Sequence, residues 1–462
     1  MITRKTLTTT ALFALIAAAP AAARQDEANR GTDGASPPTA TDTLRTKAAA
    51  VSVYRDVAIQ RFRTRDQRGL TVFEAPKNDG VPFDGFRLEF GAAFTQQFQA
   101  LSHENKAAPN VVDGVDLNRL VDIGPGFNLA AANLYVDAQL APGIRVALTT
   151  YLSSRHHPEA WVKDGYLLID ESPIAHPLLE SIMEYVTLRI GHMEVNYGDA
   201  HFRRTDNGNA LYNPFVGNYV MEAFTTEIGG EVYVRANGWL AMAGVTGGEI
   251  KGMVTRPDDR GPSFIGKLGY DRRISPDLRL RLTGSVYTTG KSVNNTLYGG
   301  DRAGSRYFYV MENEQATESA QFTSGHVNPG LRSEVTAFMI NPFVQVGGLE
   351  LFGLAEQAKG KAANETKERE WTQYAVDAVY RFFPGDRFYV GGRYNTVSGE
   401  LSGFPGQDVS VDRIQIGAGW FITPMVLMKA EYVTQKYNDF PVTDIRHGGK
   451  FNGLMVEGVI AF

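Results

Sequence analysis

The segment Leu278-Arg279-Leu280-Arg281-Leu282-Thr283-Gly284-Ser285-Val286 decides how this chain folds. Leucine or valine side chains alternate in it with charged or hydroxyl-bearing side chains. A period of two places the apolar residues on one face of a β-strand, whereas a helix would need a period of about 3.6 residues. The segment therefore predicts a strand with one apolar face and one polar face.

Segments of this kind recur from Phe86 to Phe462, and we count sixteen of them. They are Phe86–Thr95, Leu134–Leu140, Ile144–Thr149, Trp161–Ile169, Val186–Gly191, Glu227–Val234, Trp239–Thr246, Phe264–Tyr270, Leu278–Val286, Glu334–Gln345, Leu349–Glu356, Trp371–Phe382, Arg387–Asn395, Asp412–Ile422, Val426–Gln435 and Gly453–Phe462. The fourth, Trp161–Ile169, alternates least cleanly. An even number of strands predicts that both ends of the strand array lie on the same side.

The links between these segments are alternately short and long. Tight turns are expected at Ala141-Pro142-Gly143, Arg235-Ala236-Asn237-Gly238, Val346-Gly347-Gly348 and Pro384-Gly385-Asp386. Long polar links are Leu101–Gly126, Val195–Tyr219, Gly290–Arg332 and Lys436–Asn452. The link Asp170–Glu184 falls where a short turn is expected, and its Ile174–Ile182 stretch predicts a short helix.

Short turns at one end and long loops at the other are typical of membrane β-barrels. We therefore predict an all-β fold: a transmembrane, antiparallel, up-and-down β-barrel of about sixteen strands over residues 85–462. A soluble β-sandwich is the alternative, because it also has alternating strands. A sandwich would not need ten-residue strands or a difference in link length between its two ends.

The N-terminus has the pattern of a secretory signal peptide over residues 1–23. Arg4 and Lys5 precede the apolar stretch Leu7–Ala19, and Ala21-Ala22-Ala23 supplies small residues for cleavage. A short anchor helix that is not removed is the alternative. Residues 24–50 lack periodicity and predict a disordered periplasmic tail. Residues 51–84 predict a pre-barrel segment in which Val53-Tyr54 and Leu70–Phe73 are candidate short strands. The expected location is the bacterial outer membrane.

Composition narrows the function further. The formal net charge is −5 with both signs spread along the chain, which argues against a nucleic-acid binder. Cysteine is absent, so disulfides and thiolate metal sites are excluded. No cofactor is expected, and no Gly-x-Ser-x-Gly or His-Glu-x-x-His motif occurs. We therefore expect that the chain is not an enzyme.

If the apolar strand faces meet lipid, the opposite faces line an interior. The predicted lumen-lining residues include Arg145, Arg189, Arg279, Arg281, Arg393, Arg413, Glu227 and Glu231. A charged interior holds water, and about sixteen strands enclose a lumen wide enough for an aqueous channel. The alternative is that opposite charges pair across the wall and only stabilise it.

The link after the fifth strand concentrates charge and aromatic residues from Gly191 to Tyr219. Here the chain resembles the bacterial porins of sixteen strands, in which the third outer loop follows the fifth strand, folds inward and narrows the pore. It has a weaker likeness to the phosphate-selective porins. This resemblance implies a pore constriction made by His201, Arg203, Arg204, Asp199 and Asp206. The alternative is an outer loop whose charges meet water or lipopolysaccharide.

The predicted function is passive diffusion of small hydrophilic solutes or ions through a water-filled lumen. Outer-membrane lipid, lipopolysaccharide and the solutes are the expected partners, and trimers are common in the resembled family, which implies a homotrimer. Two alternatives remain open. One is a plugged barrel that acts in adhesion, and the other is a barrel enzyme of the protease or lipase type that uses Asp and His at its outer rim.

Overall fold

The computed structural model describes residues 59–77, 79–154, 159–204, 209–248, 256–300, 306–317 and 324–462. The predicted signal peptide 1–23, the tail 24–50 and the first residues of the pre-barrel segment lie outside the described residues. Everything below concerns the unit that begins at Tyr54 and includes every strand.

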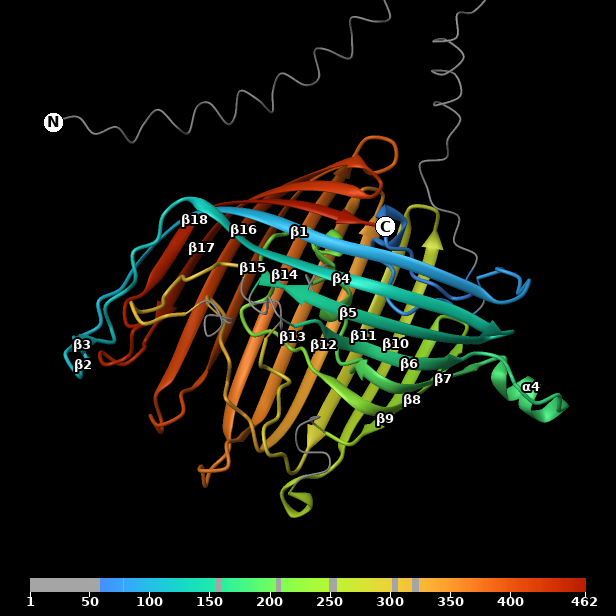
Figure 1. Ribbon diagram of the computed structural model, residues 1–462, viewed down its shortest axis with the longest axis horizontal. Coiled ribbons are helices and arrows are strands. Elements are labelled where there is room, and N and C mark those ends of the chain that lie inside the picture. Colours follow the sequence, from blue (N-terminus) through green and yellow to red (C-terminus); the bar gives the residue numbers. More distant parts are fainter. Residues whose placement is uncertain are drawn as a thin grey trace, which may run out of the picture. The chain divides into compact units, whose positions relative to one another are not determined.

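Sixteen antiparallel strands close into one barrel, as predicted (Figure 1). They are β1 (Arg87–Glu104), β4 (Gly126–Ala141), β5 (Ile144–Ser153), β6 (Trp161–Ile169), β7 (Val186–Glu194), β8 (Thr226–Ala236), β9 (Trp239–Thr246), β10 (Ser263–Ser275), β11 (Leu278–Thr289), β12 (Glu334–Val346), β13 (Leu349–Lys361), β14 (Arg369–Phe382), β15 (Phe388–Glu400), β16 (Asp408–Thr423), β17 (Val426–Asn438) and β18 (Lys450–Ala461). Pairing of β1 with β18 closes the barrel, with Ala93 opposite Ala461. The short strands β2 (Val111–Val112) and β3 (Val115–Asp116) form a separate hairpin in the first long link.

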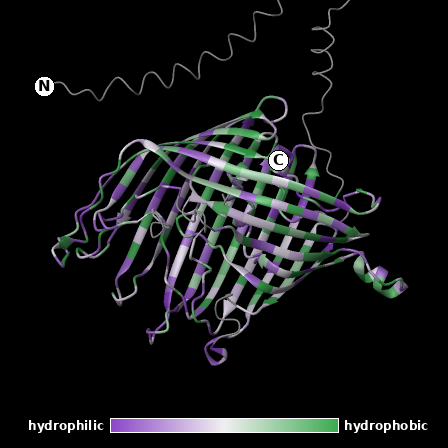
Figure 2. Ribbon diagram, viewed as in Figure 1, coloured by the Kyte–Doolittle hydropathy of each residue, from purple (hydrophilic) through white to green (hydrophobic). Residues whose placement is uncertain are grey.

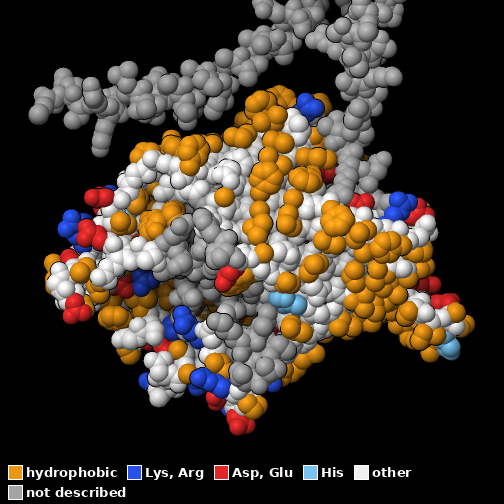
Figure 3. Space-filling model, viewed as in Figure 1, with side chains coloured by type: hydrophobic (Ala, Val, Ile, Leu, Met, Phe, Trp, Pro, Cys, Tyr) orange, Lys and Arg blue, Asp and Glu red, His pale blue; other side chains and the backbone are white. Residues whose placement is uncertain are grey.

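Hydrophilic and hydrophobic residues alternate along the strands (Figure 2), and burial shows that the two faces of the wall differ as the period-two pattern predicts. In β11, Leu282 is 54% exposed on the outside while its neighbours Arg281 and Thr283 are buried inside. Hydrophobic side chains cover much of the outer surface seen in Figure 3, with charged side chains toward the ends. An apolar outer band on a closed barrel leaves no unpaired strand edge, which is the arrangement that hydrocarbon requires. The fold is therefore a transmembrane β-barrel.

The connections also follow the predicted asymmetry. Tight turns join β4 to β5, β8 to β9 and β12 to β13, and Gly143, Gly238 and Gly347 adopt the positive φ values that such turns require. By the usual orientation of such barrels, this short-turn end faces the periplasm.

The exception among the short links is 170–185, which contains helix α4 (Pro177–Met183), close to the helix predicted at Ile174–Ile182. Figure 1 shows α4 projecting from the end of the barrel. The other helical elements are single 3-10 turns: η1 (Gln67–Gly69), η3 (Ala200–Phe202), η4 (Asn209–Tyr212) and η6 (Pro257–Asp259). Within the described residues, no helix has the length and apolar character needed to cross a bilayer.

A β-bulge explains why Trp161–Ile169 alternates poorly in sequence. Thr149 pairs with Asp164 but the next residue, Thr150, pairs with Val162, so β6 has one extra residue at Lys163. Lys163 and Asp164 are consecutive, yet both are buried inside the barrel. The bulge thus breaks the period of two without breaking the strand.

Three segments lie inside the barrel and fill much of it: residues 59–77, the described residues of the loop 195–225 between β7 and β8, and described parts of the link 290–333 between β11 and β12. Leu70–Phe73 does not form the short strand expected from its sequence. Phe73 instead packs inside the barrel against Phe343 of β12 and Phe202 of the loop.

Candidate functional site

The loop 195–225, hereafter the inward loop, lies along the inner faces of β11–β17. The Tyr219 hydroxyl donates to Asp377 of β14 at 3.0 Å, and the Val220 amide donates to Asn395 of β15 at 2.6 Å. The Val216 amide donates to Glu431 of β17 at 2.8 Å. Because its backbone donors are satisfied by side chains of the wall, the loop is held inside the barrel and does not project from its outer end.

Two of the five predicted constriction residues, Asp199 and Arg203, hold this loop in place through contacts with the wall. Asp199 is fully buried and accepts from Arg281 at 2.7 Å and from Lys267 at 3.1 Å. Arg203 reaches Glu350 of β13 at 3.3 Å. Each pairs with a wall residue of opposite charge.

Two further predicted constriction residues are Arg204 and Asp206. Arg204 donates to Glu194 at 2.8 Å and to Glu222 at 3.0 Å. These contacts join the start of the loop to its end. Asp206 lies outside the described residues.

His201 is the predicted constriction residue that borders open space. Its Nε2 lies 3.0 Å from Asn196 Oδ1, and its ring stacks on Phe202 with the centroids 3.8 Å apart. Burial lowers the pKa of His201 to about 3, although the nearby Glu194 carboxylate acts in the opposite direction. The imidazole is therefore neutral at physiological pH and adds no charge to the space beside it.

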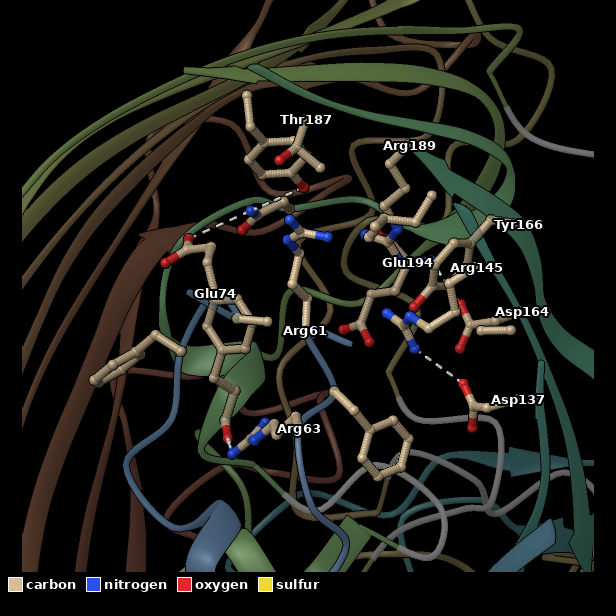
Figure 4. Close-up of a pocket in the computed structure, with 18 of the residues that line it drawn as sticks. Arg61, Arg63, Glu74, Asp137, Arg145, Asp164, Tyr166, Thr187, Arg189 and Glu194 are labelled. Atoms are coloured by element: carbon tan, nitrogen blue, oxygen red, sulfur yellow. Dashed lines mark hydrogen bonds and ion pairs between the residues drawn. The ribbon is translucent and has the colours of Figure 1, made fainter. Parts of the chain in front are cut away.

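That space is a cavity of about 250 Å³ between the β4–β8 wall, the inward loop and residues 59–77 (Figure 4). Six arginines and five carboxylates border it: Arg61, Arg63, Arg65, Arg145, Arg189, Arg235, Glu74, Asp137, Asp164, Asp170 and Glu194. Figure 4 shows Arg61 and Arg63 entering from the N-terminal segment and Arg145 and Arg189 from the wall. Charged side chains therefore reach the cavity from both the wall and residues 59–77, beside apolar side chains such as Phe73 and Leu168.

Two arginines in the cavity differ from the others. In the described part of the chain, neither Arg63 nor Arg235 has a carboxylate within 4 Å. The Arg63 guanidinium lies 3.8 Å from the Tyr212 ring centroid and donates to two backbone carbonyls. The Arg235 guanidinium lies 4.9 Å from the Tyr233 ring centroid. Both retain a net positive charge beside the open space.

The predicted lumen-lining residues all lie on the inner side of the wall, but in different settings. Arg145 and Arg189 border the cavity. The other six are engaged by segments or residues inside the barrel: Arg279 by Asp271 and Thr71, Arg281 by Glu74 and Asp199, Arg393 by Asp377 and Gly217, Arg413 by Gln435 and Asn218, Glu227 by Tyr287 and Thr246, and Glu231 by Arg189 and Asn196.

The sequence reasoning missed the arginines that residues 59–77 contribute. Arg61, Arg63 and Arg65 alternate with Phe62 and Thr64, so a period of two was present there as well. This alternation could have marked the three arginines as one charged face, but nothing local in the sequence indicates that the segment enters the barrel. Among the described residues, no group of three or more His, Asp or Glu side chains is arranged to hold a metal ion.

Known proteins resemble this chain in structure but not in sequence. No family model and no curated protein matches the chain. An anion-selective porin from Comamonas acidovorans is similar in structure, with 13% identity and a TM-score of 0.51 over 82% of this chain and 100% of that chain. OprB of Pseudomonas putida has 11% identity and a TM-score of 0.47 over 82% and 94% of the two chains. The outer membrane channel DcaP of Acinetobacter baumannii has 9% identity and a TM-score of 0.48 over 82% of this chain and 98% of that chain. The first likeness shows that this chain has the barrel fold of bacterial outer-membrane porins.

Proposed function

We propose that this outer-membrane barrel is a channel for passive diffusion of small hydrophilic solutes and ions. The observation that carries the proposal is the charged cavity beside the β4–β8 wall. The inward loop is bound to the opposite wall, so a cavity remains between it, residues 59–77 and the β4–β8 wall. A polar path that includes this cavity would replace part of the hydration shell of a passing solute.

The charges of the cavity support a preference for anions within this function. Asp137 is shared by Arg65 at 2.6 Å and Arg145 at 3.0 Å, so the three groups together carry a net positive charge. Glu194 is paired with Arg204, which lies behind the cavity. Arg63 and Arg235 have no such carboxylate partner among the residues that the structure describes. A permeating anion therefore meets more positive than negative charge that is free to interact with it.

The test is single-channel conductance of the refolded protein in a planar bilayer, with the reversal potential measured in a KCl gradient. We expect stepwise openings of constant size and a reversal potential with the sign of chloride preference. Correctly folded barrels that give no openings would overturn the channel proposal. Openings with a cation preference would be consistent with the channel proposal but would overturn the proposed anion preference of the arginines.

The filled interior also favours one of the alternatives, a plugged barrel that acts in adhesion. The same recording separates the two, because a plugged barrel is silent while it remains folded. We propose that the protein has no enzymatic activity. Loss of a hydrolytic activity in His201→Ala, with conductance retained, would contradict this. A homotrimer surrounded by lipid and lipopolysaccharide is the proposed assembly.

A further inference from the structure

Residues 59–77 lie inside the barrel without being part of its wall. We propose that this segment is a built-in plug at the short-turn end, which restricts the channel and opens it by withdrawing. The inference rests on the proposed channel function. It concerns a part of the chain to which that function alone assigns no role, because a diffusion channel needs a wall and a constriction but not a second obstruction.

The plug is held across the short-turn mouth by contacts to three different turns. The Gln67 amide donates to Pro424 O at 2.9 Å, in the β16–β17 turn. The Gln67 side chain donates to Gly385 O at 2.6 Å, in the β14–β15 turn. The Gly143 amide of the β4–β5 turn donates to Gln60 Oε1 at 2.9 Å. The β14–β15 and β16–β17 turns are neighbours on the barrel rim, and the β4–β5 turn lies beyond the β1–β18 pair. The plug also reaches β10 and β11 through Glu74, so its contacts extend across the interior.

Two ion-pair anchors fix the plug deeper in the lumen. Arg65 reaches Asp137 of β4 at 2.6 Å, and Glu74 reaches Arg281 of β11 at 2.6 Å and Lys267 of β10 at 3.2 Å. Burial alone would raise the pKa of Glu74, but the two cations outweigh it and hold that pKa below its ordinary value. Glu74 therefore remains charged, and its attachment is electrostatic.

The plug can leave without opening the wall. It contains one 3-10 turn, Gln67–Gly69, and no strand, so it contributes no hydrogen bonds to the ladder between strands. Pairing of β1 with β18 closes the barrel independently of it. The chain connects it directly to β1, which keeps a withdrawn plug beside the mouth. Withdrawal would also remove Arg61, Arg63 and Arg65 from the cavity.

The first experiment uses the full chain with both anchors reversed, Arg65→Glu together with Glu74→Lys. We expect conductance to rise about twofold or more, because the open cross-section increases, and the anion preference to fall with the loss of positive charge. The matched control is Arg119→Glu. It breaks a pair with Glu314 of 3.1 Å that is exposed at the long-loop end, and it should leave both quantities unchanged.

A cross-link provides the converse test. The chain has no cysteine, so Gln67→Cys with Pro424→Cys introduces one pair at the mouth. Oxidation should hold the plug in place and give the lowest conductance, and reduction should restore the wild-type value. Equal conductance of the oxidised and reduced forms would overturn the plug.

The outcomes separate this inference from the proposed function. Larger openings in the reversed variant than in a conducting wild type support the plug. Identical openings in the wild type and the reversed variant overturn the plug and leave the channel intact. Silence in both, with heat-dependent gel mobility showing folded barrels, overturns the channel and the plug with it.

Discussion

Charged side chains line both halves of the barrel interior, but their surroundings differ between the two halves. On the β11–β17 wall, the inward loop covers charged side chains that pair with each other and with the loop backbone. Arg393 of β15, for example, donates to Asp377 of β14 and to Gly217 O of the loop. On the β4–β8 wall, arginines such as Arg189 border a cavity. The segment that packs against an inward-facing charged side chain therefore decides whether that side chain has a structural role or borders open space. The alternation along a strand does not distinguish these two cases.

The largest effect should come from removing a charge on the covered wall. Arg393→Ala leaves Asp377 buried and without its cation, which we expect to lower the free energy of unfolding by about 3–5 kcal/mol. Urea-induced unfolding of the refolded barrel measures it. Arg393→Lys, which keeps the charge, is the control and should lose less. A stability like that of the wild type in Arg393→Ala would show that the covered wall is not held by its charges.

A smaller effect is expected where the inward loop begins. Gly198 has φ +70°, and a Cβ there would lie 2.2 Å from Met339 Sδ on β12. Gly198→Ala should cost about 1–2 kcal/mol, because a left-handed conformation is unfavourable for alanine and Met339 must move. The midpoint of thermal unfolding measures it. Gly284→Ala, where a Cβ meets nothing within 4 Å, is the matched control on the wall.

Removing a charge from the open wall should change selectivity and leave stability nearly unchanged. Arg235→Ala leaves no carboxylate unpaired, so we expect the stability to change by less than about 0.5 kcal/mol. The chloride-to-potassium permeability ratio should fall about twofold, because one cation leaves the path. Reversal potentials measure this ratio. Lys359→Ala removes a half-exposed ammonium from β13 and should leave the ratio unchanged. An unaltered ratio in Arg235→Ala would place the conducting path elsewhere.

The smallest effect concerns pH. The pKa of His201 is lowered to about 3 in the folded barrel, mainly by burial, against about 6.5 in an unfolded chain. Acidification therefore protonates the unfolded state first, and the stability linked to His201 is complete above pH 7 and declines as pH falls from about 6.5 toward 3. The advantage of wild type over His201→Gln in unfolding midpoint should shrink between pH 7.5 and pH 5. An advantage that is constant with pH would contradict the neutral imidazole.

The wall of the barrel was predictable because its information is local. Alternation in segments such as Leu278–Val286 reports which face each residue occupies, and residues such as Gly143 and Gly238 mark the turns. Sixteen strands and their order follow from these signals. The bulge at Lys163 was visible only as an irregular pattern in Trp161–Ile169, because a bulge adds one residue and shifts the period.

The filling of the interior was not predictable in the same way. The Arg65–Asp137 pair joins residues 72 positions apart, and the Tyr219–Asp377 bond joins residues 158 apart. No spacing in the sequence encodes such pairs. The charges of the inward loop could be recognised as a group, but whether Arg203 faces a wall carboxylate or open water depends on Glu350 of a distant strand. Its part in a constriction stays a prediction.

The strands also differ in length around the wall, and this has a mechanical consequence for the surrounding lipid. Strands β5 to β9 have 8 to 11 residues, whereas β1 has 18. A tilted strand needs about 9–11 residues to cross a bilayer, so this side sits at the minimum thickness. Each ångström of mismatch costs a fraction of a kcal/mol, so a thicker bilayer would meet its mismatch first beside β5–β9. The long β1 has spare length, and the barrel therefore tolerates thickening of the membrane unequally around its circumference.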